Sequence, residues 1–167
     1  MKKFILFSFL LFLSCFNPFA PKLDQQSITT AYVSDPQTPE EVLQNFVYAY
    51  NYKDSLVYAE QLDSSFVFVY FDPYLDTSGR FVSWNRDVDL KTTGRLFHNF
   101  DTITLQFNHT IYEFSDENSA ELSKTLNLNL FGKSGDFSFT GIAIFNFSKN
   151  KHTNVWKITR WRDESQM

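Results

Sequence analysis

The chain has one cysteine, no cluster of basic residues and no apolar run long enough to cross a bilayer as a helix. With Cys15 alone, no intrachain disulfide can form. The chain contains 15 Lys and Arg and 19 Asp and Glu, which gives a formal net charge of −4. Because no cluster of basic residues is present to bind phosphates, this charge pattern excludes a nucleic-acid partner. The longest apolar run, Phe4 to Leu13, falls well short of the roughly 20 residues of a transmembrane helix.

Motifs for cofactor or metal chemistry are also lacking. Gly132-Lys133-Ser134 resembles the end of a phosphate-binding loop, but Asn127 stands in place of the earlier glycine and a strand follows. Asp87 and Asp89 are two residues apart on a predicted helix, where side chains at that spacing do not face each other. No Cys and His cluster and no Ser nucleophile with a base is visible. We therefore expect no cofactor and no metal.

The first fifteen residues are the most informative segment. Lys2 and Lys3, the apolar run and the small residue Ser14 before Cys15 resemble a bacterial lipoprotein signal. An ordinary signal cleavage site is poor here, because Ala20 is followed directly by Pro21. We expect a signal peptide over residues 1–14 and a lipidated Cys15 as the membrane anchor. The alternative is an uncleaved anchor, or a cysteine that ends an apolar run by chance.

The anchor places the protein in the cell envelope, on the periplasmic or outer-membrane side if the cell is Gram-negative. Residues 15–37 contain Pro18, Pro21 and Pro36 among polar residues and show no sustained periodicity. This composition is typical of a flexible tether. Residues 38–167 then form one domain of ordinary size.

Helix signals open that domain. Thr38-Pro39-Glu40-Glu41 combines an N-cap threonine, a proline at the first helical position and a glutamate three residues after the cap. Apolar residues at helical spacing extend this helix to about Lys53, and Asp54 is the expected cap of a second, short helix. The apolar run 66–71 predicts a buried strand, and a third helix is expected to begin at Ser83.

After the third helix, the periodicity changes from helical to alternating. Apolar and polar residues alternate from Ile103 to Asn108 and again from Thr125 to Leu130, and two further strands are predicted over residues 137–148 and 155–163. Helices followed by long antiparallel strands predict an α+β domain, with about three N-terminal helices against a curved antiparallel sheet.

This outline resembles the nuclear transport factor 2-like superfamily, also known as the ketosteroid-isomerase or polyketide-cyclase-like cone. The resemblance rests on the capped first helix, the short second helix that leads into an apolar strand, Trp84 and the terminal segment 156–161. It implies a cone-shaped α+β barrel with a pocket between sheet and helices, frequent dimers through the outer sheet face, and both enzymes and non-catalytic members. Enzymes of the superfamily carry a carboxylate or His inside the cone, often facing a Tyr or a second acid.

The candidate site residues are those that the alternation of a strand is expected to turn toward the inside of the cone. His109 follows Ile103, Leu105 and Phe107 in the inward phase and is a weak candidate for a general base, the alternative being a solvated His at a strand end. Arg160 shares its phase with Trp156 and Ile158, which would place it inside the cone for an anionic ligand, or at the mouth beside an acidic residue. The remaining pocket candidates, which are also candidates for ordinary core, are Phe46, Tyr50, Trp84 and Trp156.

Without a catalytic acid/base pair, we expect a lipid-anchored, non-catalytic envelope protein that binds an apolar small ligand or a protein partner. The alternative is a hydrolase, isomerase or dehydratase of the cone superfamily that uses His109 or an acid residue elsewhere. We also expect a homodimer through the outer sheet face, where the pleat turns Ile142 and Ile144 away from the helices.

Overall fold

The computed structural model describes residues 33–165, which form three helices and six strands. The helices lie in the N-terminal part of this segment, and long strands make up the rest, as the sequence pattern predicts. The elements in chain order are α2 (Pro39–Tyr52), α3 (Ser55–Gln61), β1 (Leu62–Asp72), β2 (Arg80–Asn85), α4 (Arg86–Asn99), β3 (Thr102–Ser115), β4 (Ser119–Phe131), β5 (Phe137–Lys149) and β6 (Trp156–Asp163).

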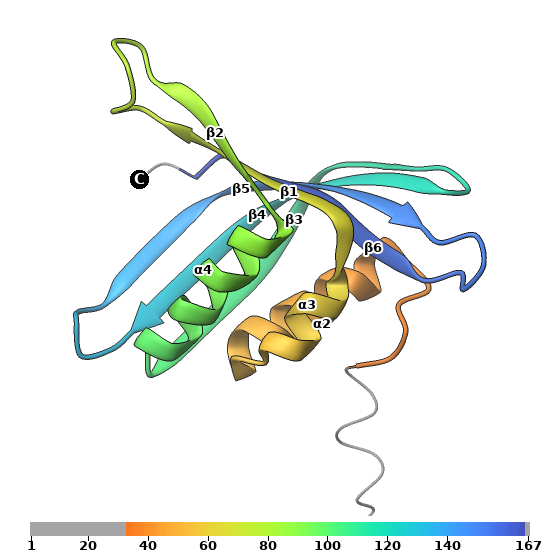
Figure 1. The fold of residues 1–167 in the computed structure, drawn as a ribbon, viewed down its shortest axis with the longest axis horizontal. Helices are drawn as coiled ribbons and strands as arrows, with labels where there is room; N and C mark the ends of the chain where they lie inside the picture. The colour runs from red at the N-terminus through yellow and green to blue at the C-terminus, as the bar shows by residue number, and fades with distance from the viewer. Residues whose placement is uncertain (1–32, 166–167) are drawn as a thin grey trace, which may run out of the picture.

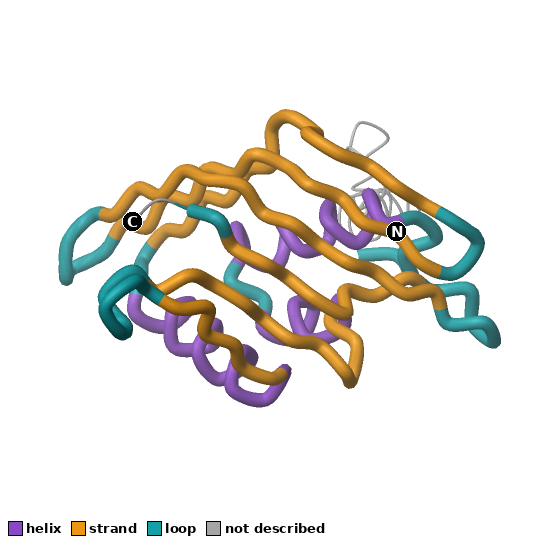
Figure 2. Tube along the Cα trace, turned by 90° about the horizontal axis from the view of Figure 1, so that it is seen from above, coloured by secondary structure: helices purple, strands orange, loops and turns teal. Residues whose placement is uncertain are grey.

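The strands form one curved sheet in the order β2-β1-β6-β5-β4-β3, and the three helices lie together on one of its faces (Figures 1 and 2). All neighbouring strands are antiparallel except β1 and β6, which are parallel. The predicted α+β class is confirmed. The sheet does not close into a barrel, because β2 and β3 remain its two edges.

The predicted starts of the first two helices are confirmed by their caps. The Thr38 hydroxyl accepts a hydrogen bond of 3.2 Å from the Glu41 amide. Asp54 Oδ1 accepts 3.0 Å bonds from the amides of Leu56 and Val57. These side chains satisfy amide groups that have no partner within the first helical turn.

The prediction that a helix begins at Ser83 is wrong. Residues 80–85 form strand β2 against β1, and α4 begins at Arg86, capped by Asn85. Trp84 lies opposite Phe68 in this ladder, and the two rings stack with centroids 4.6 Å apart. Pairing with β1, a long-range contact, decides the conformation of a segment that is too short to carry a clear period of its own.

The core between sheet and helices is aromatic. Phe46 of α2 is fully buried at its centre, with ring centroids 5.0–5.7 Å from those of four other rings. Those rings belong to Tyr50, Tyr58, Phe145 and Trp161. These rings fill the space around Phe46 between α2 and the sheet.

The expected signal peptide, the lipidated Cys15 and most of the expected tether lie outside the described residues. The last tether residues, 33–37, lie against the domain: Val33 packs on the core, and the Pro36 carbonyl accepts a 3.0 Å hydrogen bond from the Trp156 amide. Within residues 33–165, no helix has the length and apolar character needed to cross a membrane.

Candidate functional site

A small cavity that opens to the surface beside the exposed Thr92 remains between α4, β2 and the sheet, with a volume of about 110 Å³. Its wall includes a carboxyl group, since Asp89 of α4 is 3% exposed and lies beside Tyr50 and Trp84. The full lining is Tyr50, Phe68, Trp84, Asp89, Thr92, Thr93, Leu96 and Trp161. Of the expected pocket residues, Tyr50 and Trp84 therefore line this cavity.

Asp89 is the centre of a buried hydrogen-bond network. The Tyr58 hydroxyl donates to Asp89 Oδ2 over 2.5 Å, and Trp84 Nε1 donates to Oδ1 over 2.9 Å. Tyr50 lies beside the network, because its ring contacts that of Tyr58 edge to face with the centroids 5.6 Å apart. The carboxyl of Asp89 is thus held by two donors from two different elements, α3 and β2.

Burial changes the titration of all three groups. Desolvation raises the pKa of Asp89 above its ordinary 3.8, although the hydrogen bonds from Tyr58 and Trp84 act in the opposite direction. Desolvation also raises the pKa of Tyr50 and of Tyr58, and the nearby Asp89 adds to both shifts. A carboxyl that retains its proton to higher pH, beside two neutral phenols, is the kind of group that supplies acid/base chemistry.

The size of the cavity limits what this network can do. Ligand pockets usually have about 300–1,000 Å³, so a cavity of 110 Å³ accommodates a few water molecules rather than a substrate. Trp161 Nε1 is buried and has no hydrogen-bond partner among the described residues. A water molecule in the cavity is a suitable partner for such a group.

Sequence reasoning missed Asp89 because it considered only local spacing. Asp87 is exposed and Asp89 is buried, which is what a helix dictates for residues two apart. The helical periodicity of α4 was the pattern that could have identified Asp89. Asp89, Thr93 and Phe97 recur every four residues along α4 and form its buried stripe.

The prediction that Arg160 points into the cone is wrong. Asn146 pairs with Arg160 and Phe147 with Ile158, so Thr159 is an extra residue in β6. This β-bulge reverses the alternation. Trp156, Ile158 and Trp161 are buried, whereas Arg160 is exposed on the other face.

The inward phase expected for His109 is also wrong. The register of β3 shifts between Phe107 and Thr110, and every residue from Asn108 to Ser115 is exposed. The backbone amide of His109 donates to Thr125 Oγ1 over 3.0 Å. His109 is therefore exposed and does not line the cavity that contains Asp89. It is not placed to act as a base inside the cone.

The other candidates occupy ordinary structural positions. Phe46 is core, and Trp156 is buried beside Lys149, whose Nζ lies 5.9 Å from the centroid of the indole ring. Ile142 and Ile144 alternate with the buried Ala143 and Phe145, so they face away from the helices, and both are half-buried. The homodimer expected through this face stays a prediction.

A larger hollow lies between helix α2 and edge strand β3. It is a groove of about 630 Å³. The half-buried Val47 and Phe107 supply apolar surface above the buried Leu43 and Leu105, and Tyr48 and Tyr52 supply two rings whose centroids are 4.6 Å apart. The other lining residues are Glu40, Gln44, Asn51, Gln106 and Asn108.

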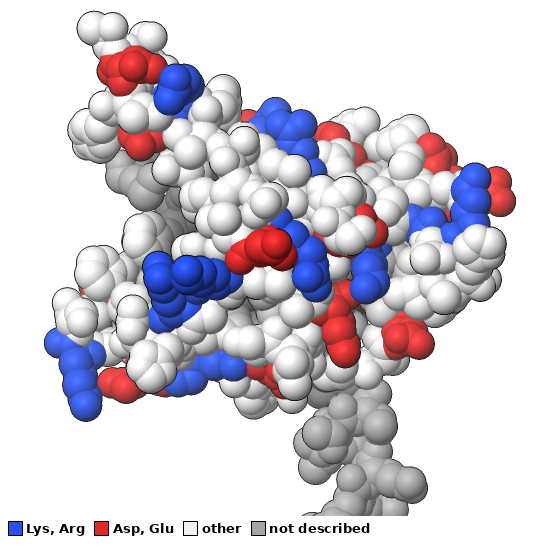
Figure 3. All heavy atoms as spheres, viewed as in Figure 1, with Lys and Arg blue, Asp and Glu red and all other residues white. Residues whose placement is uncertain are grey.

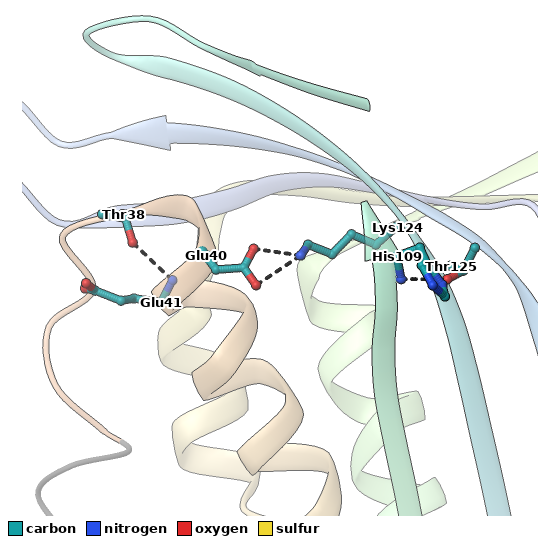
Figure 4. A network of polar contacts seen from close by, with 6 residues as sticks. All are labelled: Thr38, Glu40, Glu41, His109, Lys124 and Thr125. Carbon is teal, nitrogen blue, oxygen red and sulfur yellow. Dashed lines mark hydrogen bonds and ion pairs between the residues drawn. The ribbon is translucent and has the colours of Figure 1, made fainter. Parts of the chain in front are cut away.

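Glu40 is the charged residue of the groove lining, and it is paired. Lys124 Nζ reaches from β4 to the first turn of α2 and lies 2.8 Å and 3.0 Å from the two carboxylate oxygens (Figure 4). The Lys124 side chain is 9% exposed and the Glu40 side chain 52%. The ammonium group of Lys124 is thus a buried charge that depends on one carboxylate.

The surface charge is mixed. Acidic and basic side chains are interspersed with neutral ones on the face shown in Figure 3. Among residues 33–165, no group of three or more His, Cys, Asp and Glu side chains is placed to hold a metal ion.

No model of a known protein family matches the sequence, and a search of curated proteins found no match. Solved structures do match. A conserved protein from Planctomyces limnophilus superposes with a TM-score of 0.64 at 16% identity, over 76% of this chain and 92% of that one. A nuclear transport factor 2-like superfamily protein from Salmonella enterica gives 0.59 at 13%, over 76% and 87%.

A third structure, a provisionally assigned dehydratase of the same superfamily from Streptomyces avermitilis, gives a TM-score of 0.59 at 14% identity, over 75% of this chain and 91% of that one. Identities this low establish the fold alone. Three helices against one curved six-stranded sheet, with these structural neighbours, identify the architecture as the nuclear transport factor 2-like cone fold.

Proposed function

We propose that this protein is a membrane-tethered, non-catalytic binding domain of the cell envelope, and that its ligand site is the α2–β3 groove rather than the cone interior. One observation carries this proposal. The groove measures about 630 Å³, within the usual range of ligand sites, whereas the cone retains only about 110 Å³.

The chemistry of the groove indicates the class of ligand. Val47, Phe107 and the exposed ring of Tyr52 offer dispersion contacts, and neutral amides at Gln44 and Asn108 offer hydrogen bonds without charge. Such a lining suits an uncharged, largely apolar group of a small molecule or of a protein.

Photolabelling of the purified full chain with a neutral alkyl diazirine tests the position of the site. We expect peptide mapping to place the adducts on groove residues, and Gln44→Trp, which fills the groove from an exposed position, to suppress them. Val88→Trp adds the same ring to an exposed position of α4 and serves as the control. Adducts confined to Trp84 and Asp89 would instead assign binding to the cone.

The envelope location rests on the signal-like segment that ends at Cys15. If Cys15 is lipidated, mass spectrometry of the protein isolated from membranes finds a mature chain that begins with a diacylated Cys15, and Cys15→Ala releases or misprocesses the protein. An unmodified amino terminus at another residue contradicts the tether.

A second candidate function is acid/base catalysis inside the cone. The observation that favours it is the buried Asp89 carboxyl, whose pKa is raised and which Tyr58 and Trp84 hold in place. One structural neighbour is provisionally assigned as a dehydratase. Screening β-hydroxy carbonyl compounds for loss of water tests this reading, with Asp89→Asn expected to abolish any turnover although the variant is still folded in a circular dichroism spectrum.

A further inference from the structure

Strand β3 is a long edge of the sheet, and the register shifts that interrupt it lie beyond Phe107. It is 14 residues long, is paired with β4 on one side, and contains a single charged residue, Glu113, and no Lys or Pro. The opposite edge, β2, has six residues and begins with Arg80. Natural edge strands are usually short, charged or interrupted by proline, because a long uncharged edge pairs readily with another strand.

The outward edge of β3 already forms hydrogen bonds with the side-chain amide of Asn51. Asn51 of α2 accepts a 2.6 Å hydrogen bond from the Leu105 amide and donates one of 3.3 Å to the Leu105 carbonyl. A carboxamide carries the same donor and acceptor as a peptide group, so Asn51 occupies the place of one residue of a neighbouring strand. In an antiparallel ladder, outward-directed backbone groups recur at every second residue, and Phe107 is the next in this phase.

The groove continues from Asn51 along this edge. Its apolar surface comes from Val47 of α2 on one side and from Phe107 on the other. Its charged lining residue, Glu40, is neutralised by Lys124. A helix beside an open strand edge, with an apolar and uncharged space between them, complements an extended peptide without charges.

We infer that the α2–β3 groove binds an extended, uncharged peptide segment of a protein partner, which adds as a further strand to the edge of β3. Backbone hydrogen bonds to β3 beyond Leu105 supply the alignment. Alternate side chains of the peptide enter the space between Leu43, Val47 and Phe107. This inference rests on the proposed function, since it names the ligand class of the same groove.

The test is fluorescence anisotropy of a labelled peptide, acetyl-Gln-Val-Thr-Val-Gln-amide, with the purified full chain. Its matched control is the same peptide with alternate backbone nitrogens N-methylated. This control keeps the side chains, but its methylated edge cannot donate hydrogen bonds to β3. We expect saturable binding of the first peptide and binding about tenfold or more weaker for the second, because each lost hydrogen bond contributes severalfold. Gln44→Trp is expected to weaken binding of the first peptide by a similar factor, and Val88→Trp to leave it unchanged.

Equal binding of the two peptides would overturn strand addition, as would the absence of binding to either. In both cases, photolabelling in the groove would leave the proposed function standing. Photolabelling outside the groove would remove the proposed function and this inference together. Val47→Trp gives a second groove-filling variant, so that a folding defect in one does not decide the result.

Discussion

The hydroxyl of Tyr58 and the carboxyl of Asp89 are joined by a 2.5 Å hydrogen bond between α3 and α4, inside a core that is otherwise largely apolar. Both side chains are buried. Because burial of a carboxylate is costly, this contact and the one from Trp84 make Asp89 tolerable there, and they link its protonation to the stability of the fold.

Asp89 is predicted to make stability fall as pH rises. Its pKa is raised in the folded protein, so between the ordinary 3.8 and the folded value the native state binds more protons than the unfolded state. The free energy of unfolding therefore decreases with pH across this window through Asp89. Asparagine cannot titrate, but it still accepts from Trp84 and donates to Tyr58. Urea unfolding at several pH values should show the stability of Asp89→Asn relative to wild type increasing from about pH 4 upward; a pH-independent difference contradicts the linkage.

The Glu40–Lys124 pair is predicted to be asymmetric. Glu40→Gln leaves a buried ammonium without its carboxylate and should cost about 1–3 kcal/mol, whereas Lys124→Met leaves a half-exposed carboxylate in water and should change stability by less than about 1 kcal/mol. Chemical denaturation measures both. Asp76→Asn is the control, since Asp76 and Arg80 form a pair that is 62% and 63% exposed. That change should cost less than about 0.5 kcal/mol. Equal losses for the first two variants would show that burial of Lys124 is not decisive.

Phe46 is predicted to be the most costly ring to remove. Phe46→Ala leaves a cavity among the four rings it contacts and should lower the free energy of unfolding by about 3–5 kcal/mol. Tyr74→Ala, at a position 92% exposed, should change it by no more than about 0.5 kcal/mol. Urea unfolding compares the two, and a small loss for Phe46→Ala would mean that the neighbouring rings collapse into the space.

Self-association through the outer face of the sheet is predicted to depend on Ile142 and Ile144. Substituting Ile142→Lys and Ile144→Glu places charges on that face and should shift a dimer to monomer in sedimentation of the segment from Val33 onward. Thr153→Lys, at an exposed position in the turn before β6, controls for added charge. A wild-type segment that sediments as a monomer at tens of micromolar contradicts the prediction.

The local features of this fold followed from the sequence. Thr38-Pro39-Glu40-Glu41 and Asp54 start their helices because capping depends on residues within one turn. Alternation over residues 103–107 and 126–130 placed Ile103, Leu105, Leu126 and Leu130 in the core, since a strand turns successive side chains to opposite faces. The order of these elements was sufficient to indicate the cone fold.

The site depended on contacts between distant segments. Two register shifts, at Thr159 and between Phe107 and Thr110, moved Arg160 and His109 out of the expected phase, and no local pattern marks a bulge of this kind. Tyr58, Trp84 and Asp89 come from three elements and converge only when α3, β2 and α4 pack together. The sequence by itself determined where the first two helices begin and which class of fold the elements build, because those preferences are local. Tertiary structure alone decided how little of the cone stays open and that the ligand-sized space lies between α2 and the edge of β3, because both depend on how side chains from distant parts of the chain fill a shared volume.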